Sequence, residues 1–460
     1  PIVTNQYQGC YLQPKPELLP VIKPKLIEKA VALQITDYID VNGLNEEFQS
    51  AYRKKHSTET ALLRVQNDVL MAMDNQKVVV VVMLDLSAAF DTVDHSILLQ
   101  RLNDYFGVTG IALKWFQSYL ENRKQCVKIE GVKSEYVSLT CGVPQGSIMG
   151  PLLFNIYTRP LGDVISNHGL DYQIYADDSE MYLAFKPKTS ADENHALNTL
   201  SNCNDDINDW MLENKLKKND DKTDAMVIGT WQQLRKVSSD SITIGQSTIK
   251  FSTEVKSLGA IIDQHMDMEA HIIKTCQTGF MHLKNICSIR KYLNKSAIES
   301  LVHAFVTSRI DYCNSLLVGV SKDRLQKLQR LQNAAARVII KAHKYDHITP
   351  VLKQLHWLTV EYRVQFKILV LVFKSLHGLA PPYLSSLFKY RQVTRSLRSN
   401  SGPAPLLEEL KTSNVRGGDR AFCVYGAKEW NKLPVHIKVC DQLDTFKHEL
   451  KTFLFRKCYF

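Results

Sequence analysis

Three aspartates are the residues of this sequence best suited to chemistry: Asp85, Asp177 and Asp178. Asp177 and Asp178 are adjacent, in the stretch LDYQIYADDSEMYLAF, and no basic residue stands beside them in the sequence. Two carboxylates held this close repel each other, and a bound divalent cation relieves the repulsion. Two such ions, about 3.5–4 Å apart, can hold both the attacking and the leaving oxygen of a phosphoryl transfer. The aspartates therefore predict a site for magnesium ions.

Two segments with strand-like sequences carry these aspartates. The apolar run at 78–84, VVVVVML, is typical of a buried strand and ends directly before Asp85. Residues 170–185 alternate on both sides of the acidic pair, which predicts a hairpin with the pair at its tip. A single aspartate after a strand is most often a turn residue or a helix cap. The metal site thus requires the strand and the hairpin to be neighbours.

Helices and short hairpins are predicted on either side of these segments. The sequence predicts helices at 25–39, 57–75 (capped by Ser57 or Thr58), 88–107, 111–122, 152–166, 191–214 and 321–341. In the first of these helices, Leu26, Ile27, Ala30, Leu33 and Ile35 are expected on one face. The alternating segment around Gly131 predicts a hairpin, and the segments SITIG, STIKF and VKSLGAIID over 241–263 predict short strands.

The charge of the chain is unevenly divided. Residues 1–270 contain 26 Lys and Arg against 35 Asp and Glu, whereas residues 271–460 contain 31 against 12. A basic half favours a polyanionic partner, and nucleic acid is the usual one, although charge alone also fits a solubilising surface. No apolar run approaches the roughly 20 residues of a membrane helix, so no membrane partner is expected.

Five motifs over residues 77–262 resemble the palm motifs of reverse transcriptases in order and spacing: LDLSAAFDTVDH, GVPQGSIMGPLLFNIYT, YADD, NKLKKNDDKTDAMVIG and KSLGAIID. They look most like those of non-LTR (LINE, jockey-like) retrotransposons. Upstream, FQSAYRKKHSTETALL resembles the junction of fingers and palm in these elements, and the tail from VLKQLHWL to EWNKLP resembles their C-terminal region.

The resemblance implies an α+β right-hand polymerase fold, with fingers, a palm with an antiparallel sheet, and a helical thumb, plus a mostly helical C-terminal region. We expect fingers and palm at 1–262, with the fingers truncated, and the thumb at 263–345. Residues 346–460 would form an element-specific region of unknown role. Because the chain begins with Pro1, we expect a C-terminal fragment that lacks the endonuclease of such elements.

The resemblance also implies roles for single residues. Asp85, Asp177 and Asp178 would bind two magnesium ions, with manganese as an alternative, and Lys222 would protonate the pyrophosphate leaving group. Phe90 resembles the steric gate against a ribose 2′-hydroxyl; its alternative is a helix core residue. The other implied site residues are Gln145 and Gly146 at the incoming nucleotide, Tyr175 against primer or core, and Leu258 and Gly259 in the primer grip.

The implied function is an RNA-directed DNA polymerase that extends a primer 3′-hydroxyl with dNTPs on an RNA template. Its partners would be template RNA, a DNA primer and dNTPs, in a ribonucleoprotein of nucleus and cytoplasm.

The chain lacks the Arg-Pro pair expected in the fingers, for which Lys15, Lys23 and Arg53 are candidate substitutes. Two alternatives stay open: a catalytically decayed RNA-binding remnant of the same fold, and an RNA-dependent RNA polymerase, against which Phe90 and Ala176 argue.

Overall fold

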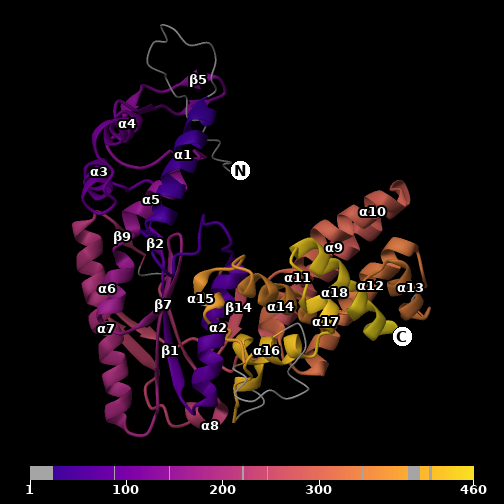
Figure 1. Ribbon diagram of the computed structural model, residues 1–460. Helices are drawn as coiled ribbons and strands as arrows, with labels where there is room; N and C mark the ends of the chain where they lie inside the picture. Colours follow the sequence, from indigo (N-terminus) through magenta and orange to yellow (C-terminus); the bar gives the residue numbers. More distant parts are fainter. Residues whose placement is uncertain are drawn as a thin grey trace.

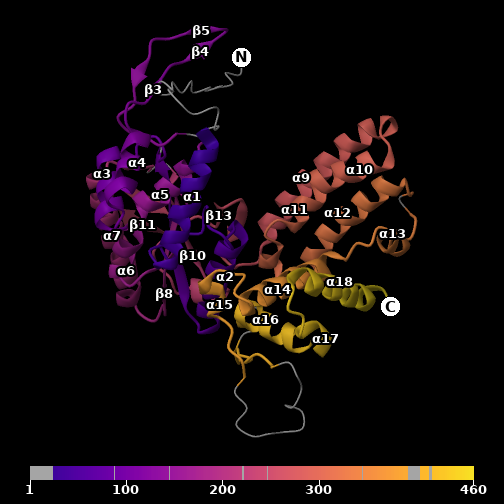
Figure 2. The ribbon, with the colours of Figure 1, turned by 45° about the horizontal axis from the view of Figure 1, so that its top comes forward.

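The computed structural model describes residues 24–87, 89–144, 146–219, 222–245, 247–343, 345–391, 405–413 and 417–460. The part of the chain up to about residue 263 contains every strand of the described residues, and the part after it is helical (Figure 1). Turned by 45°, the α9, α10 and α12 helices stand apart from the side of the molecule that holds α1 and α3 to α7, with α2, α14 and α16 between them at the base (Figure 2). The α+β fold with a helical second half is confirmed.

The longer helices have these bounds: α1 Pro24–Val41, α2 Thr58–Asp74, α3 His95–Asp104, α4 Gly110–Leu120, α5 Met149–Thr158, α6 Leu161–Asn167, α7 Ser190–Glu213, α9 Glu269–Ile289, α10 Lys295–Val302, α12 Lys322–Ile340, α13 Ile348–Gln354, α14 Val360–Leu376, α16 Phe422–Asn431 and α18 Leu443–Tyr459. Short helices are α8 Trp231–Leu234, α11 Ser308–Asp311, α15 Pro382–Ser385 and α17 Val435–Lys438. The strands are β1 Val78–Leu84, β2 Leu86–Ser87, β3 Lys124–Gln125, β4 Lys128–Ile129, β5 Val132–Lys133, β6 Val137–Ser138, β7 Asp171–Tyr175, β8 Asp178–Phe185, β9 Lys217–Lys218, β10 Asp224–Ile228, β11 Ser241–Ile244, β12 Ser247–Lys250, β13 Glu254–Ser257 and β14 Ala260–Asp263.

The central sheet is four-stranded and antiparallel, in the order β10-β1-β8-β7. The β1 strand lies between β8 and β10, and its side chains alternate between two hydrophobic cores. Val79 and Val81 belong to one core, and Val78, Val80 and Val82 to the other. This explains why the strand is an unbroken apolar run, because both of its faces are covered.

The core on the α2 face extends well beyond the sheet, and we call it the shared core. It contains buried side chains of α2, α9, α12, α14 and α18, among them Leu63, Ile272, Leu331, Phe373 and Phe446. The other core, which we call the sheet core, is formed with α3, α5 and α7. Because one apolar core continues from the sheet to the last helix, the helices on both sides of residue 346 pack as one body. The boundaries expected at 263 and 346 stay a prediction.

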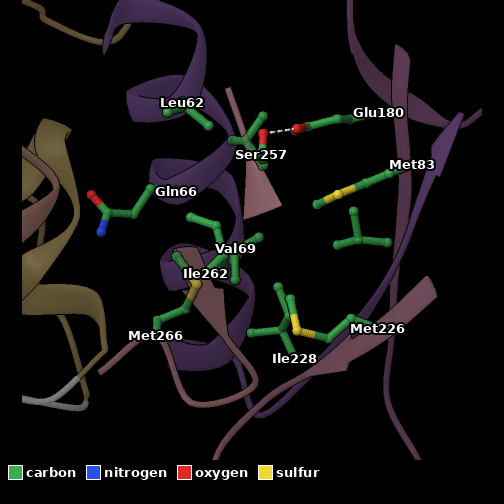
Figure 3. Close-up of a pocket in the computed structure, with 12 residues that line it drawn as sticks. Leu62, Gln66, Val69, Met83, Glu180, Met226, Ile228, Ser257, Ile262 and Met266 are labelled. Carbon is green, nitrogen blue, oxygen red and sulfur yellow. Dashed lines mark hydrogen bonds between the residues drawn. The ribbon is translucent and has the colours of Figure 1, made fainter. Parts of the chain in front are cut away.

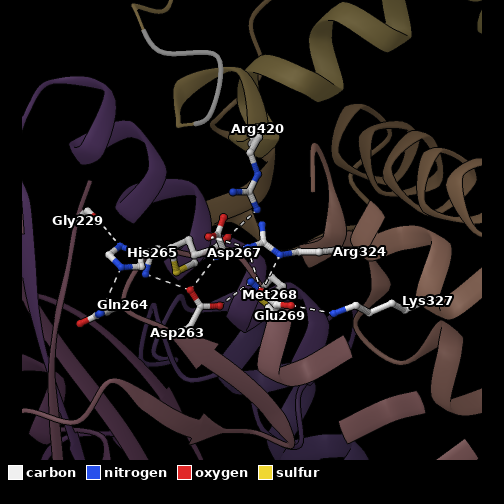
Figure 4. Close-up of polar contacts among 11 residues, drawn as sticks. Gly229, Asp263, Gln264, His265, Asp267, Met268, Glu269, Arg324, Lys327 and Arg420 are labelled. Atoms are coloured by element: carbon white, nitrogen blue, oxygen red, sulfur yellow. Dashed lines mark hydrogen bonds and ion pairs between the residues drawn. The ribbon is translucent and has the colours of Figure 1, made fainter. Parts of the chain in front are cut away.

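A buried arginine joins the C-terminal region to the point where the sheet half meets the helical half. Arg420 is 5% exposed and donates to the carbonyl oxygen of Val318 at 2.9 Å and to that of Met266 at 2.8 Å. Figure 4 shows its guanidinium group beside a cluster of ion pairs at the start of α9. In that cluster, Arg324 of α12 bonds to Asp267 at 3.1 Å and to Glu269.

Several predicted elements match closely, and three predictions were wrong in detail. The helix expected at 152–166 is two helices, α5 and α6, because Pro160 lacks the N–H that a continuous helix needs. The helix expected from residue 88 begins only at His95, where the Asp94 carboxylate accepts from the Ser96 and Ile97 amides as an N-cap.

The α1 helix exists, but the face predicted for it does not. Leu26, Ile27 and Leu33 are exposed, while Ile35 and Ile39 are buried. At about 100° per residue, Ile35 lies on the side of the helix opposite Leu26. The two residues therefore could not share a face.

Among the described residues, no helix combines the length and the apolar character required to cross a membrane.

The position of Arg420 leads to a prediction on stability. Arg420→Met leaves the carbonyl groups of Met266 and Val318 buried without this donor, so the free energy of unfolding should fall by about 2–4 kcal/mol. Thermal or urea unfolding measures the loss. The matched control is Arg456→Met, because Arg456 is exposed on the last helix. Equal stability of the two variants would contradict the bracing role of Arg420.

Candidate active site

Strand register brings two of the three predicted aspartates together. The pairing of β1 with β8 ends at Leu84 opposite Ser179, so the next pair along the same register is Asp85 and Asp178. The pairing of β1 with β10 places Met83 opposite Asp224, and its continuation sets Lys222 beside Asp85. A shift of one residue in either pairing would separate these groups, because side chains alternate between the two faces of a sheet.

The turn between β7 and β8 sets the position of the acidic pair. Tyr175 pairs with Asp178, which leaves Ala176 and Asp177 as a two-residue loop. Ala176 has a φ of +58°, in the left-handed region that such tight hairpin loops require. Asp177 therefore stands at the tip of the hairpin as predicted, whereas the prediction was wrong for Asp178, which is the first residue of β8 and pairs with Tyr175.

Asp85 is held by residues that follow α7. The Lys222 ammonium group is 3.0 Å from Oδ2 of Asp85. The side-chain amide of Asn219 lies 3.5 Å from the same oxygen, and the Asn219 backbone N–H donates to the Asp85 carbonyl at 2.9 Å. Asn219 was not predicted, although it stands three residues before Lys222 in the motif NKLKKNDDKTDAMVIG. In the structure it lies opposite Asp85 across the β2–β9 pair.

The negative charges of the three aspartates act on one another. Partial burial, and then the charges of Asp177 and Asp85, raise the pKa of Asp178 to about 6, while Lys222 acts in the opposite direction. The side chains as they stand do not enclose a cation: in the described ranges, no three His, Cys, Asp or Glu side chains form a metal-binding group. The oxygen donors and the excess negative charge nevertheless fit a hard divalent cation.

A cleft of about 550 Å³ opens beside these groups. Its walls come from the ends of β1, β8, β10 and the β13–β14 hairpin, and the residues lining it are Met83, Leu84, Asp85, Asp178, Ser179, Glu180, Lys222, Asp224, Lys256, Ser257, Leu258 and Gly259. Five predicted site residues thus meet at one cleft: Asp85, Asp178, Lys222, Leu258 and Gly259. Lys256 and Asp224 line it too and were missed, although Lys256 lies two residues before the predicted primer grip.

The other predicted site residues, Asp177 at the hairpin tip among them, do not line this cleft. Phe90 is partly buried and stacks on Phe154 at 4.5 Å between ring centroids. It packs against the sheet core from a turn before α3, and not from a helix as the alternative interpretation expected. Tyr175 is partly buried at the end of β7, and Gly146 has a φ of +75° in the turn before α5. Gln145 lies outside the described residues, as do Lys15 and Lys23.

Arg53, the third candidate for the missing fingers arginine, is turned toward the protein. Its guanidinium group donates to the carbonyl oxygens of Glu46 and Gln49, the first at 2.5 Å and the second at 2.8 Å. Burial lowers the pKa of this guanidinium. Because the Arg53 guanidinium is already bound to carbonyl oxygens of the neighbouring backbone, it is poorly placed to contact a triphosphate.

The predicted primer grip is the tight turn of the β13–β14 hairpin. Leu258 and Gly259 both have positive φ, +44° and +85°. Tyr312, from the helical half, donates to the Leu258 carbonyl oxygen and lies against Gly259. Beneath the turn, Ser257 donates to the buried Glu180 carboxyl group at the edge of a small internal cavity of about 20 Å³ (Figure 3). The turn is thus fixed both to the β8 strand, through Glu180, and to the helical half, through Tyr312.

Comparison with known proteins agrees with this geometry. A family profile described as reverse transcriptase (RNA-dependent DNA polymerase) matches residues 14–262, more than half of the chain. The chain belongs to the reverse transcriptase family. The matched residues contain every predicted site residue and all the strands of the described sheet.

Transposon proteins are among the curated relatives. The chain is 25% identical to the probable RNA-directed DNA polymerase from transposon BS of Drosophila melanogaster, over 74% of this chain and 37% of that protein. It is 26% identical to the RNA-directed DNA polymerase from mobile element jockey of Drosophila funebris, over 70% of this chain and 35% of that protein. These relatives confirm the resemblance to jockey-like elements, and the chain spans little more than a third of their length.

Solved telomerase structures are also similar to the chain. Apo telomerase from Candida tropicalis aligns with 79% of this chain and 61% of its own, at 11% identity and a TM-score of 0.38. Telomerase from Candida albicans in complex with a fragment of telomeric RNA aligns with 72% of this chain and 56% of its own, at 11% identity and a TM-score of 0.35.

The raised pKa of Asp178 leads to a prediction on stability and pH. Because the folded-state pKa lies above that of the unfolded chain, the folded protein binds more protons between about pH 4 and pH 6, and the ionised form destabilises it above that range. In metal-free buffer at pH 7.5, Asp178→Asn should therefore raise the free energy of unfolding by about 1 kcal/mol, a small gain because solvent screens the partly exposed group.

The gain from Asp178→Asn should disappear below about pH 4, where the wild-type carboxyl group is protonated in both states. Thermal unfolding of both proteins across this pH range provides the measurement. Asp209→Asn serves as the control, since Asp209 is exposed on α7. A loss of stability at pH 7.5 would show that Asp178 is not under electrostatic strain.

Proposed function

We propose that this chain is the polymerase part of a non-LTR retrotransposon protein and that it extends a primer 3′-hydroxyl with dNTPs on an RNA template. The observation that supports this most directly is the register of β1 with β8 and β10, which sets Asp85, Asp178 and Lys222 at one cleft. The family match and the transposon relatives agree with it.

In this proposal, Asp85, Asp177 and Asp178 hold divalent magnesium, with manganese as the alternative. The bound ions would supply positive charge for the transferring phosphoryl group. The residues of the chain have other tasks. The antiparallel strands fix the carboxylates relative to one another, and the Leu258–Gly259 turn at the far wall of the cleft positions the primer end.

Lys222 is proposed to donate a proton to the leaving pyrophosphate. Its ammonium group is exposed on the cleft side, and its salt bridge to Asp85 keeps it at the site. A general acid must lie within hydrogen-bond reach of the group that it protonates, directly or through one water. The position of Lys222 opposite Asp85 agrees with that requirement.

The helical half is proposed to act as the thumb, which holds the template and primer. Residues 271–460 carry the net positive charge of the chain, as a phosphate-binding surface requires. The division into a thumb at 263–345 and an element-specific region at 346–460 remains part of this proposal. Residues 346–460 pack into the shared core together with the helices of the proposed thumb. This packing supports a structural contribution of residues 346–460 to the thumb.

Primer extension tests the activity. With magnesium, an RNA template and a DNA primer, the wild-type chain should incorporate dNTPs, and Asp177→Asn should reduce incorporation to background because a metal ligand is lost. Asp171→Asn, at the opposite end of β7, is the matched control and should retain activity. Template binding without any extension by the wild type would instead favour the RNA-binding remnant.

The steric gate can be tested by the choice of sugar. Phe90→Val should lower the preference for dNTP over rNTP by about tenfold or more, because a smaller side chain leaves room for the 2′-hydroxyl. The ratio of kcat/KM values for dTTP and UTP measures the effect. Phe116→Val, a buried aromatic of the same core, should cost stability and leave the ratio unchanged. A wild-type preference for rNTPs would revive the RNA-dependent RNA polymerase alternative.

A further inference from the structure

The FQSAYR segment has no role in the site so far, yet it is tied to the hairpin that carries the aspartates. The Ser50 N–H donates to the Ile174 carbonyl at 2.9 Å, and the Ile174 N–H donates to the Phe48 carbonyl at 3.0 Å. Gln49 and Ile174 thus form a parallel bridge at the free edge of β7. The segment acts as a short additional strand beside the catalytic hairpin.

The side chain of Gln49 reaches further, to the turn itself. Its Oε1 accepts from the N–H of Ala176 at 3.0 Å and from the N–H of Ala51 at 2.9 Å. Its Nε2 lies 3.4 Å from the Ala176 carbonyl oxygen, to which it donates. Gln49 is 3% exposed, so all three contacts are made out of water.

These contacts fall on the residue of the hairpin that most needs them. Ala176 has a left-handed backbone, a conformation that costs a residue with a side chain about 1 kcal/mol or more. It is also buried, so its N–H and carbonyl groups must find partners within the protein. The amide of Gln49 supplies both partners and stabilises the turn that directs Asp177 and Asp178.

The same segment also reaches the aromatic residue proposed as the gate. The Ala51 carbonyl accepts from the Asn155 side-chain amide at 2.9 Å, which anchors the segment on α5. The ring of Tyr52 then stands edge-on to Phe90, with centroids 6.4 Å apart. One short stretch of backbone thus contacts the acidic turn at Gln49 and the gate at Tyr52.

We propose that Gln49 is a positioning residue of the polymerase: its side-chain amide clamps the backbone of Ala176 and thereby fixes the carboxylates of Asp177 and Asp178. The proposal rests on the proposed function for its effect on catalysis. Gln49 does not touch substrate in this role. Its effect on the reaction passes through the turn.

The test replaces Gln49 by methionine, which has a similar volume but cannot hold the Ala176 backbone. Gln49→Met should lower kcat in primer extension by about 10- to 100-fold, because a small displacement of the catalytic groups is costly. The KM for template and primer should change by no more than about twofold, because binding contacts remain.

Gln66→Met is the matched control. Gln66 is also 3% exposed, and it also donates to a backbone carbonyl, but that carbonyl belongs to Leu316 in the helical half, at 2.8 Å, and not to the turn. Both variants should lose thermal stability. Only Gln49→Met should lose kcat; an equal loss of kcat in the two variants would show that Gln49 acts only through overall stability and would overturn the proposal.

Amide hydrogen exchange gives a readout that does not depend on activity. In Gln49→Met, exchange over residues 171–178 should accelerate relative to Gln66→Met, because the Ala176 N–H loses its acceptor. Gln49→Glu keeps an oxygen acceptor and should retain the protection. Unchanged exchange in Gln49→Met overturns the proposal. A wild-type chain without polymerase activity overturns the proposed function instead, and exchange still decides the role of Gln49.

Discussion

The pairing register of one strand determines most of what this protein can do. The β1 strand is paired on both edges and buried on both faces, so it can neither slide nor rotate without exposing valines or losing a ladder of hydrogen bonds. Leu84 is the last residue of β1, so Asp85 lies beside the first residue of β8 and the residues that precede β10. The hydrophobic alternation of β1 therefore fixes where the charges meet as well as how the sheet folds.

The shared core gives the second constraint, which links the two halves of the chain. Helix α2 packs against the sheet on one side and contributes to the same core as α14 and α16 on the other. Buried polar contacts accompany this packing: Tyr383 Oη lies 2.8 Å from Ser50 Oγ, and the Cys423 N–H donates to Asn67 at 3.1 Å. The C-terminal region therefore contacts the segment that clamps the catalytic turn. This gives a structural reason why the region after residue 346 accompanies the polymerase.

Sequence patterns predicted the elements and the acidic residues well where the local signal was strong. The limits of β1 and α2 follow from unbroken hydrophobicity and a Ser cap, and the 170–185 hairpin follows from alternation, all of which are local properties. The tip of that hairpin lies one residue earlier than predicted. The clamp by Gln49, the salt bridge of Lys222 to Asp85 and the brace by Arg420 could not be predicted in this way. Each joins residues more than 100 positions apart, and nothing in the local sequence distinguishes a glutamine that holds a turn from one in solvent. The error at 152–166 was avoidable, since Pro160 was visible in the sequence.

The electrostatics of the site explain how a fourth carboxyl group, that of Glu180, is tolerated close to the three aspartates. Glu180 lies two residues beyond Asp178 and is buried beneath the cleft, and burial raises its pKa to about 7. Below that pH, the group is mostly protonated and neutral, so it adds little to the repulsion among the aspartates. Its contact with Ser257 then acts as an ordinary hydrogen bond that secures the primer-grip turn. The carboxyl groups in the cleft therefore divide by solvent access. Asp178, the more exposed of the two, is largely ionised at neutral pH, whereas the buried Glu180 is only about half ionised there and carries less negative charge.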